Sequence, residues 1–309
     1  MADESLRLPV SAPPGCTLFE ARVRTPGALR AAVAAARAQG RIIGFVPTMG
    51  ALHAGHVSLV ALLKARGAFV AASVFVNPRQ FAAHEDLGAY PRDLAGDAAK
   101  LAAAGCDLLY APDAAAIYPA DFATTVHVGG VSEGLESAAR PHFFGGVATV
   151  VAKLLLQAGA DLAAFGEKDY QQLLVVRRLV QDLDIPCEIV PGPIVREADG
   201  LAMSSRNAYL SAPEREVAGR FNGVLREAVR AIEAGEAVAP ALARCEARLL
   251  AAGFARVEYV ALRDAADLAP VSGDRLDRPA RLLATVVLGK TRLLDNFAVR
   301  PAAYSARAG

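Results

Sequence analysis

Short apolar runs alternate with amphipathic stretches from Pro26 to about Asp184. Four mostly apolar runs have the length of buried parallel strands, namely Ile42–Val46, Ala68–Val76, Cys106–Ala111 and Asp161–Phe165. Apolar residues at helical spacing predict helices around them, over Pro26–Ala38, Val57–Arg66, Asp93–Ala104, Gly146–Gln157 and Tyr170–Leu183. This alternation of strand and helix predicts an α/β class with a doubly wound parallel sheet.

The pattern changes after Val190–Ile194, a stretch rich in Pro and Gly that is typical of a hinge. Ser211-Ala212-Pro213-Glu214 then has the pattern of a capping box that opens a long helix. A second helix is predicted over Ala239–Ala252, followed by three strand-like runs over Arg256–Leu262, Leu282–Leu288 and Arg292–Val299. We therefore expect a larger α/β domain over residues 1–194 and a smaller α+β domain over residues 195–309 that closes over the ligand site.

Composition narrows the class of protein. Hydrophobic residues make up 54% of the 309 positions, but much of this is alanine, and no apolar run approaches the roughly 20 residues of a membrane-spanning helix. The net charge of +1 gives no reason to expect a nucleic-acid surface. The four cysteines are far apart and form no C-x-x-C pair, which favours reduced thiols over a disulfide framework. The acidic start Met1–Ser5 lacks the pattern of a signal peptide, so we expect a cytoplasmic protein.

The segment Pro47–His56 carries the strongest candidate chemistry. It lies between a predicted strand and a predicted helix, and a turn of this kind binds anions through free backbone N–H groups and the helix dipole. His53 and His56 are three residues apart, so one helical turn brings both to the same side. Gly55 between them allows a ligand to approach the backbone closely. The segment therefore favours a polyphosphate site, with two imidazoles as donors.

Alternatives to this interpretation stay open at this point. Paired histidines often bind a metal ion, but the glutamate of an H-E-x-x-H site is absent and no Cys or acidic cluster lies beside them. Core histidines with satisfied hydrogen bonds are another alternative. Gly50 and Gly55 have the spacing of a P-loop, but His56-Val57 stands where Lys-Ser/Thr is required. Gly289-Lys290-Thr291 lies between two predicted strands, which indicates a hairpin turn. No G-x-G-x-x-G motif supports dinucleotide reduction.

Two further segments carry candidate phosphate ligands. In Gly166-Glu167-Lys168-Asp169, which follows a predicted strand, Lys168 is able to reach a phosphate and Asp169 to hold ribose hydroxyls. An ordinary surface ion pair is the competing interpretation. In Met203-Ser204-Ser205-Arg206-Asn207, two hydroxyls and an arginine near the predicted hinge are able to close over a triphosphate, or to form a solvated loop.

A third pair of segments suggests an uncharged substrate surface. Asn77-Pro78-Arg79-Gln80 ends a predicted strand and offers two amides, which read hydroxyls and carboxylates without a charge; an ordinary turn is the alternative. Val147, Val150 and Val151 share one helix face, which forms either plain core or an apolar wall for a branched substrate.

Taken together, these segments resemble the pantothenate synthetase (pantoate–β-alanine ligase) family of the nucleotidylyltransferase superfamily. The matching stretches follow family order across nearly the whole chain: Pro47–His56, Val74–Phe81, Glu85–Asp93, Gly166–Gln172, Val195–Leu210 and Arg278–Asn296. The His-x-Gly-His turn alone indicates only nucleotidyl transfer, whereas VFVNPRQF, GEKDYQQ and VREADGLAMSSRN together are highly specific. The resemblance implies a Rossmann-like nucleotidylyltransferase fold and an enzyme that joins pantoate to β-alanine with ATP, through pantoyl adenylate.

The resemblance also implies a set of site residues. Those expected to act on the phosphates are His53, His56, Lys168, Ser204, Ser205 and Arg206. Those expected to bind ATP further include Met49, Gly55, Gly166, Asp169, Val195 and Met203. Those expected to bind pantoate are Pro47, Met49, Asn77, Gln80, Arg140, Val147, Val150, Val151 and Gln172. Mg²⁺ is expected with ATP, although no protein ligand is assigned to it, and the family is typically a homodimer.

One short segment departs from the family pattern. The family usually reads Arg-Pro-Gly-His-Phe-x-Gly-Val where this chain has Arg140-Pro141-His142-Phe143-Phe144-Gly145-Gly146-Val147. His142 therefore takes the place of a glycine and Phe143 that of a histidine. Two other hypotheses remain: an adenylyltransferase for a nucleotide or phosphopantetheine, which predicts a basic acceptor pocket, and a non-catalytic ATP-binding protein, for which this departure is the only support.

Overall fold

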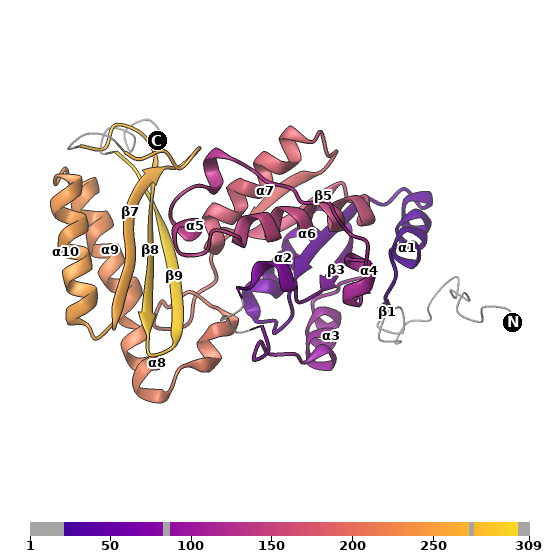
Figure 1. Cartoon of the computed structure of the whole chain (residues 1–309), viewed down its shortest axis with the longest axis horizontal. Helices are drawn as coiled ribbons and strands as arrows, with labels where there is room; N and C mark the ends of the chain where they lie inside the picture. Colours follow the sequence, from indigo (N-terminus) through magenta and orange to yellow (C-terminus); the bar gives the residue numbers. More distant parts are fainter. Residues whose placement is uncertain (1–21, 83–86, 272–274, 302–309) are drawn as a thin grey trace, which may run out of the picture.

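The computed structural model describes residues 22–82, 87–271 and 275–301, and these contain two sheets (Figure 1). The first is a six-stranded parallel sheet in the order β1-β4-β3-β2-β5-β6. Its strands are β1 Arg22–Val23, β2 Ile43–Thr48, β3 Phe69–Val74, β4 Leu108–Tyr110, β5 Leu162–Gly166 and β6 Glu188–Gly192. The prediction of a doubly wound parallel sheet is confirmed, and the order reverses between β2 and β5.

Helices cover both faces of this sheet, so its central strands are buried and almost wholly apolar. One face packs against α2 Ala54–Lys64 and α3 Leu94–Ala103. The other packs against α1 Pro26–Ala38, α6 Phe143–Ala158 and α7 Tyr170–Asp182. Shorter elements lie in the connections, namely α4 Ala114–Ile117, α5 Glu136–Ala139 and 3₁₀ turns over Pro78–Gln80, Gly130–Ser132 and Glu167–Asp169.

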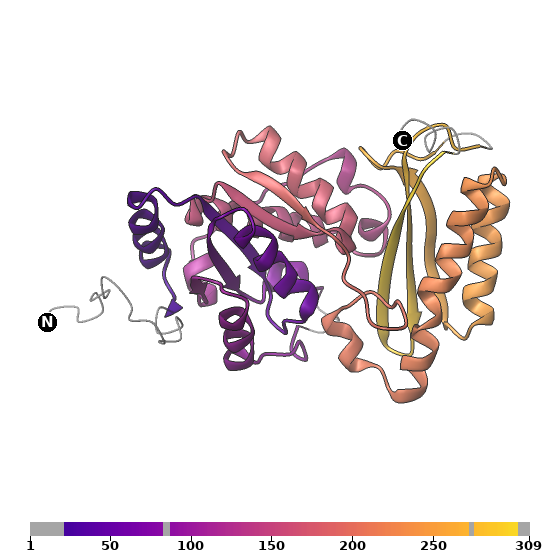
Figure 2. The ribbon, with the colours of Figure 1, turned by 180° about the vertical axis from the view of Figure 1, so that it is seen from behind.

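The C-terminal part is an antiparallel sheet with helices on one side (Figures 1 and 2). Its elements are α8 Ala212–Ala218, α9 Arg220–Glu233, α10 Val238–Ala251, β7 Arg256–Asp264, β8 Ala280–Leu288 and β9 Thr291–Val299, preceded by a 3₁₀ turn over Ser205–Tyr209. Alternate residues of β8, such as Leu282 and Val286, are buried against α9 and α10. Leu283 points the other way and joins the core of the parallel-sheet part. This sheet therefore has one face on its helices and one toward the first sheet, while the division into domains at residue 195 stays a prediction.

The predicted hinge at Val190–Ile194 is wrong over its first three residues. They belong to β6, which pairs with β5 from Leu162↔Glu188 to Gly166↔Gly192. Pro191 fits there because β6 is an edge strand, and the missing N–H need not cost a ladder hydrogen bond. The two-residue strand β1 was not predicted.

Helix starts account for most other differences. α2 begins at Ala54 and α6 at Phe143, each three residues before the predicted start. The long helix after the capping box is divided at Gly219 into α8 and α9. The capping box itself is confirmed, since Ser211 N–H donates to Glu214 Oε2 at 2.8 Å. The hairpin turn between β8 and β9 is also confirmed, with Gly289 at φ +56°.

The cysteines of the described residues are buried and unpaired, as predicted. Burial raises the pKa of Cys106 and Cys187 to about 12 and that of Cys245 to about 11, so these thiols stay protonated. Cys16 lies outside the described residues. Among the described helices, none has both the length and the apolar content needed to cross a membrane.

Candidate active site

A cavity of about 1640 Å³ lies between the carboxyl ends of the parallel strands and the facing side of the antiparallel sheet. β2 and β5 flank the point where the strand order reverses, which is where doubly wound sheets bind ligands. All the site residues predicted above line it: Pro47, Met49, His53, Gly55, His56, Asn77, Gln80, Arg140, Val147, Val150, Val151, Gly166, Lys168, Asp169, Gln172, Val195, Met203, Ser204, Ser205 and Arg206. The fold thus brings together residues from widely separated parts of the chain.

The two histidines form the start of α2. His53 is the N-cap, and its Nδ1 accepts the Gly55 N–H at 3.2 Å. His56 Nδ1 accepts the His53 N–H at 3.3 Å, so the two side chains make a capping box of the kind that Ser and Glu usually form. The ring centroids are 4.1 Å apart. Because each neutral ring accepts through Nδ1, each carries its proton on Nε2.

Burial also keeps both rings uncharged. It lowers the pKa of His53 to about 4, helped by the positive charge of Lys168. It lowers the pKa of His56 to about 3, helped by His53 and Lys168. At neutral pH the pair therefore offers two neutral Nε2–H donors to the cavity, and no hydrogen-bond partner occupies them among the described residues.

The turn before the histidines is held by Asp97 of α3, a residue that sequence reasoning missed. Its carboxylate accepts the Ala51 N–H at 2.9 Å and the Leu52 N–H at 2.7 Å. Gly50 lies at φ +88°, and a Cβ there would come within 2.9 Å of Asp97 Oδ2. Lys100 Nζ donates to Leu52 O at 2.7 Å from the same helix. The only signal in the sequence was an acidic residue on an otherwise Ala-rich helix, which does not identify a partner 46 residues away.

Lys168 lies in the 3₁₀ turn that joins β5 to α7, across the strand-order reversal from the histidines. Its side chain is 18% exposed, and its Nζ is 3.5 Å from the Asp169 carboxylate, which is 47% exposed. The predicted surface pair therefore exists, but it lies on the wall of the cavity. Gly166 ends β5 beside it, and a Cβ there would meet only Lys168 N, at 4.0 Å.

Ser204, Ser205 and Arg206 lie on the opposite wall. Ser204 Oγ accepts the Arg206 N–H at 3.3 Å and begins a 3₁₀ turn. Ser205 Oγ and Tyr90 Oη are 3.3 Å apart. Tyr90 belongs to the predicted Glu85–Asp93 motif, of which residues 85 and 86 lie outside the described part of the chain. The loop thus faces the ends of the parallel strands.

The two amides of the Asn77–Gln80 segment differ: the Asn77 amide is bonded to protein groups, whereas part of the Gln80 amide is open to the cavity. Asn77 is buried, and its Nδ2 donates to Gln80 Oε1 at 2.7 Å and to Gly146 O at 3.1 Å. Its Oδ1 accepts from Tyr118 Oη at 2.8 Å, so protein partners already occupy the Asn77 amide. Gln80 accepts through Oε1 and keeps its Nε2 for a ligand.

Gln171 and Gln172 are adjacent on α7 but have different surroundings. Gln171 is buried and bonds only to protein groups: its Oε1 accepts the Glu136 N–H at 3.1 Å, and its Nε2 donates to Val131 O at 3.1 Å. Both residues line the cavity, but the Gln172 amide has no hydrogen-bond partner in the described structure. Sequence alone did not say that the two neighbours differ in this way.

The valine face of α6 is part of the core and also part of the cavity wall. Val147, Val150 and Val151 are at most 5% exposed and belong to the main core, yet they also line the cavity. α6 reaches the cavity because Gly146 allows it to touch the Pro78–Gln80 turn. A Cβ at Gly146 would be 2.2 Å from Arg79 O.

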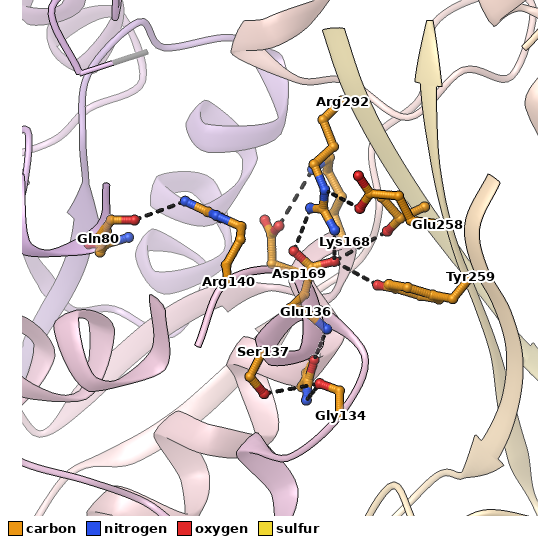
Figure 3. Close-up of polar contacts among 12 residues, drawn as sticks. Gln80, Gly134, Glu136, Ser137, Arg140, Lys168, Asp169, Glu258, Tyr259 and Arg292 are labelled. Carbon is orange, nitrogen blue, oxygen red and sulfur yellow. Dashed lines mark hydrogen bonds and ion pairs between the residues drawn. The ribbon is translucent and has the colours of Figure 1, made fainter. Parts of the chain in front are cut away.

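The segment that departs from the family pattern forms the start of α6. His142 precedes its first residue in a helical conformation, so its replacement of glycine requires no left-handed turn. The Arg140 guanidinium lies over the Phe143 ring, with Arg140 Cζ 4.0 Å from the ring centroid. Arg140 Nη2 also donates to Gln80 O at 2.9 Å (Figure 3). Phe143 therefore holds Arg140 by a cation–π contact beside the Gln80 amide.

A buried ionic cluster joins this region to the antiparallel sheet, and sequence reasoning missed it. Glu136 of α5 accepts two hydrogen bonds from Arg292 of β9, at 2.5 and 2.8 Å (Figure 3). Tyr259 Oη donates to the same carboxylate at 2.7 Å, and Thr285 Oγ1 at 3.2 Å. Arg292 Nε donates to Glu258 at 2.8 Å. Burial raises the pKa of the Glu136 carboxyl, but Arg292 outweighs this and holds the pKa below its usual value.

Metal ligands are scarce in the described structure. It contains no group of three or more His, Cys, Asp or Glu side chains that could hold a metal ion. The metal alternative for His53 and His56 therefore has no support there. A magnesium ion bound to a nucleotide would need few protein ligands, because Mg²⁺ usually binds to phosphate oxygens, waters and at most one or two carboxylates.

Comparison with known proteins agrees with this geometry. The model of the family described as pantoate-beta-alanine ligase matches residues 21–298. Pantothenate synthetase from Rhizorhabdus wittichii is 57% identical over 280 residues, which cover 91% of this chain and 99% of that protein. The enzyme of the same name from Caulobacter vibrioides is 55% identical over 278 residues, covering 90% and 98%.

Solved structures give the same result. A crystal structure of pantothenate synthetase from Thermus thermophilus matches with a TM-score of 0.85 and 46% identity, covering 91% of this chain and 99% of that one. Pantoate-beta-alanine ligase from Francisella tularensis, complexed with beta-gamma ATP and beta-alanine, matches with a TM-score of 0.75 and 31% identity, covering 89% and 96%.

Proposed function

The chain belongs to the pantoate-beta-alanine ligase family, and we propose that its central cavity carries out both steps of that reaction. The enzyme condenses pantoate with β-alanine to form pantothenate and uses ATP, which leaves as AMP and pyrophosphate. This family membership sets aside a nucleotide adenylyltransferase. A non-catalytic ATP-binding protein descended from the enzyme is disfavoured because His53, His56, Lys168 and Arg206 are all present and line one cavity.

In the first step, a carboxylate oxygen of pantoate attacks the α-phosphorus of ATP, and the bond to the β-phosphate oxygen breaks. His53 and His56 donate their Nε2–H groups to the phosphates as negative charge moves toward pyrophosphate. Lys168, Ser204, Ser205 and Arg206 contact the same phosphates from the other walls. Catalysis of this kind rests on positioning and charge stabilisation, since no protein atom forms a covalent bond.

The remaining roles concern the two organic parts of the substrates. Gly166 and Asp169 hold the ribose, and Pro47, Met49, Gly55, Val195 and Met203 line the path of the nucleotide and of pantoate. Gln80 and Gln172 bind the hydroxyl and carboxylate oxygens of pantoate through their open amides. Val147, Val150 and Val151 face its methyl groups. We assign Asn77 an indirect role, because its amide is already bonded to Gln80, Gly146 and Tyr118.

In the second step, the uncharged amine of β-alanine attacks the acyl carbon of pantoyl adenylate. The bond between that carbon and the phosphate oxygen breaks, AMP leaves, and the amine loses a proton to solvent. Arg140 lies beside Gln80, which suits a substrate carboxylate at this end of the cavity.

One observation carries the proposal. Two neutral donors at the end of β2 and a lysine at the end of β5 line one cavity, together with open amides and an apolar wall. Mg²⁺ enters as part of the ATP substrate, bound to phosphate oxygens. By family resemblance we also propose that the protein is a cytoplasmic homodimer. Sedimentation of the purified chain tests whether it forms a dimer.

Exchange of labelled pyrophosphate into ATP tests the reaction directly. We expect exchange with pantoate present and β-alanine omitted, because adenylate formation is reversible. Exchange without pantoate, or only with phosphopantetheine, would contradict the proposal. ATP binding without exchange under any condition would also contradict it.

Two substitutions separate the roles within the cavity. Lys168→Ala should lower kcat for exchange by about 10²–10³ with little change in the KM for ATP, because it acts on developing charge. Gln80→Ala should mainly raise the KM for pantoate. A Lys168→Ala enzyme with normal kcat and raised KM for ATP would refute the first role, and normal pantoate affinity in Gln80→Ala would refute the second.

A further inference from the structure

The two loops that face the proposed phosphate site are far apart in the chain, at residues 166–169 and 195–206. Two consecutive residues of β9 hold these loops: Asn296 binds the first loop and Asp295 binds the second. Asp295 and Asn296 are 1% and 2% exposed. Successive side chains of a strand point to opposite faces, so the pair reaches both loops at once.

Asn296 holds the Lys168 loop. Its Nδ2 donates to Glu167 O at 2.9 Å and to Lys168 O at 2.8 Å, which uses both amide hydrogens. Its Oδ1 accepts from Arg281 Nε at 2.6 Å, and this contact fixes the orientation of the amide. Arg281 also donates to the Glu167 carboxylate at 3.3 Å and lies 4.1 Å from the Tyr170 ring centroid. The backbone on both sides of Lys168 is therefore bound to the antiparallel sheet.

Asp295 holds the other loop through Arg196. The guanidinium donates to both carboxylate oxygens, at 2.7 and 2.9 Å, in the bidentate geometry that is strongest for this pair. Arg196 Nη1 also donates to Gly200 O at 3.0 Å. The backbone of Arg196 pairs with Ala202 in an isolated antiparallel bridge, two residues before Ser204. Asp295 is thus connected to the Ser204–Arg206 turn through its ion pair with Arg196 and the backbone bridge from Arg196 to Ala202.

We propose that Asp295 and Asn296 are positioning residues for the first step, because they set the Lys168 loop and the Ser204–Arg206 loop at a fixed distance from each other. The inference rests on the proposed function of the cavity. Only the first step moves charge onto pyrophosphate, so an error in this distance affects adenylate formation more than attack by β-alanine. A displacement of about 1 Å in a reacting group costs about 10²-fold in rate.

Asn296→Asp is the sharpest test. It keeps the side-chain shape and the acceptor for Arg281, but it replaces the donor Nδ2 with a carboxylate oxygen that faces the carbonyls of Glu167 and Lys168. We expect kcat for pantoate-dependent pyrophosphate exchange to fall about 10²-fold. Conversion of synthetic pantoyl adenylate and β-alanine to pantothenate should change less than about threefold on the same argument. Equal losses in both half-reactions, or no loss in exchange, would overturn the proposal.

Arg196→Gln provides a second variant, which decides the matter if Asn296→Asp fails to fold. It detaches the other loop from Asp295 and should show the same split between half-reactions. Arg215→Gln is its matched control, since Arg215 makes a bidentate pair with Asp199 of the same loop but points away from the cavity. The control should leave both half-reactions unchanged. Failure of wild-type enzyme to catalyse exchange would count against the proposed function, whereas wild-type exchange without a split in the variants would count against the positioning role alone.

Discussion

Backbone N–H groups occupy the Nδ1 atoms of His53 and His56, so each neutral ring presents an Nε2–H donor to the cavity. The same contacts begin α2, so the fold itself selects the tautomer. Burial then removes the charge that a histidine often carries near neutral pH. A neutral donor stabilises developing negative charge without first holding the phosphate in a strong ion pair.

The first prediction concerns the pH dependence of these rings. With pKa values of about 4 and 3, neither should titrate between pH 5 and 9. The rate of pantoate-dependent exchange should therefore show no ionisation near pH 6.5 that depends on His53 or His56. Long-range ¹⁵N NMR titration of the imidazoles checks this directly, and a ring that titrates near pH 6.5 would contradict it.

The same shifts affect stability, with a definite sign. Both pKa values are lower in the folded state than the ordinary 6.5, so the unfolded chain binds more protons below that pH. The stabilisation is complete above pH 6.5 and is lost as the pH falls toward the folded-state pKa values, about 4 for His53 and about 3 for His56. His56→Asn should reduce the difference between urea midpoints measured at pH 7 and at pH 5. An unchanged difference would show that the His56 ring does not titrate in this way.

Most cavity residues could be predicted because they lie in short motifs that follow strands. Asp97 and Glu136 could not, since each is an isolated acid whose partners are 45 to 156 residues away. Asn77 shows the opposite limit. Its position at a strand end was clear from the sequence, but whether its amide faces a ligand or Gln80 depends on side-chain geometry.

At the level of elements, the predictions succeeded where hydrophobic periodicity is strong and erred where Pro or Gly has a tertiary role. β6 was taken for a hinge because Pro191 and Gly192 are typical of turns, yet an edge strand tolerates both. α6 was expected to start at Gly146, whereas it includes Gly145 and Gly146 in its first turn. Gly146 is there because another segment touches it, which local propensity does not report.

This contact gives a prediction for α6. Gly146→Ala places a methyl 2.2 Å from Arg79 O, so the Pro78–Gln80 turn must move. We expect a loss of about 1–3 kcal/mol in unfolding free energy and a several-fold rise in the KM for pantoate. Gly145→Ala is the matched control, because its Cβ meets nothing within 4 Å and alanine favours a helix. The explanation fails if the two variants have the same melting temperature and the same KM.

In the molecule as a whole, polar contacts join the two sheets beside the apolar contacts of residues such as Leu283. Glu136 with Arg292, Arg281 with Glu167 and the Asn296 amide all cross from one part to the other. Two sheets of parallel and antiparallel type were predictable from the order of elements. The way they face each other was not, because these contacts join residues far apart in the chain.

The buried Glu136–Arg292 pair should contribute strongly to stability. Glu136→Gln leaves Arg292 without its main carboxylate partner, and breaking such a pair costs about 3–5 kcal/mol. Because Glu258 still accepts from Arg292, we expect the lower end of that range, measured by denaturant unfolding at pH 7. Asp182→Asn, which breaks the exposed Arg178–Asp182 pair, should change nothing measurable. Equal changes in unfolding free energy for the two substitutions would show that the buried pair stabilises the protein no more than the exposed pair.

The size of the cavity also determines what becomes of the intermediate. Its volume of about 1640 Å³ exceeds the roughly 300–1,000 Å³ usual for a pocket that holds one small molecule. An acyl adenylate is a mixed anhydride that water destroys, so an enzyme that releases it wastes ATP. When both half-reactions share one chamber, pyrophosphate departs and the amine arrives while the anhydride stays where it was made. A chamber of this size has room for the adenylate and the amine together, so the second step requires no transfer between sites.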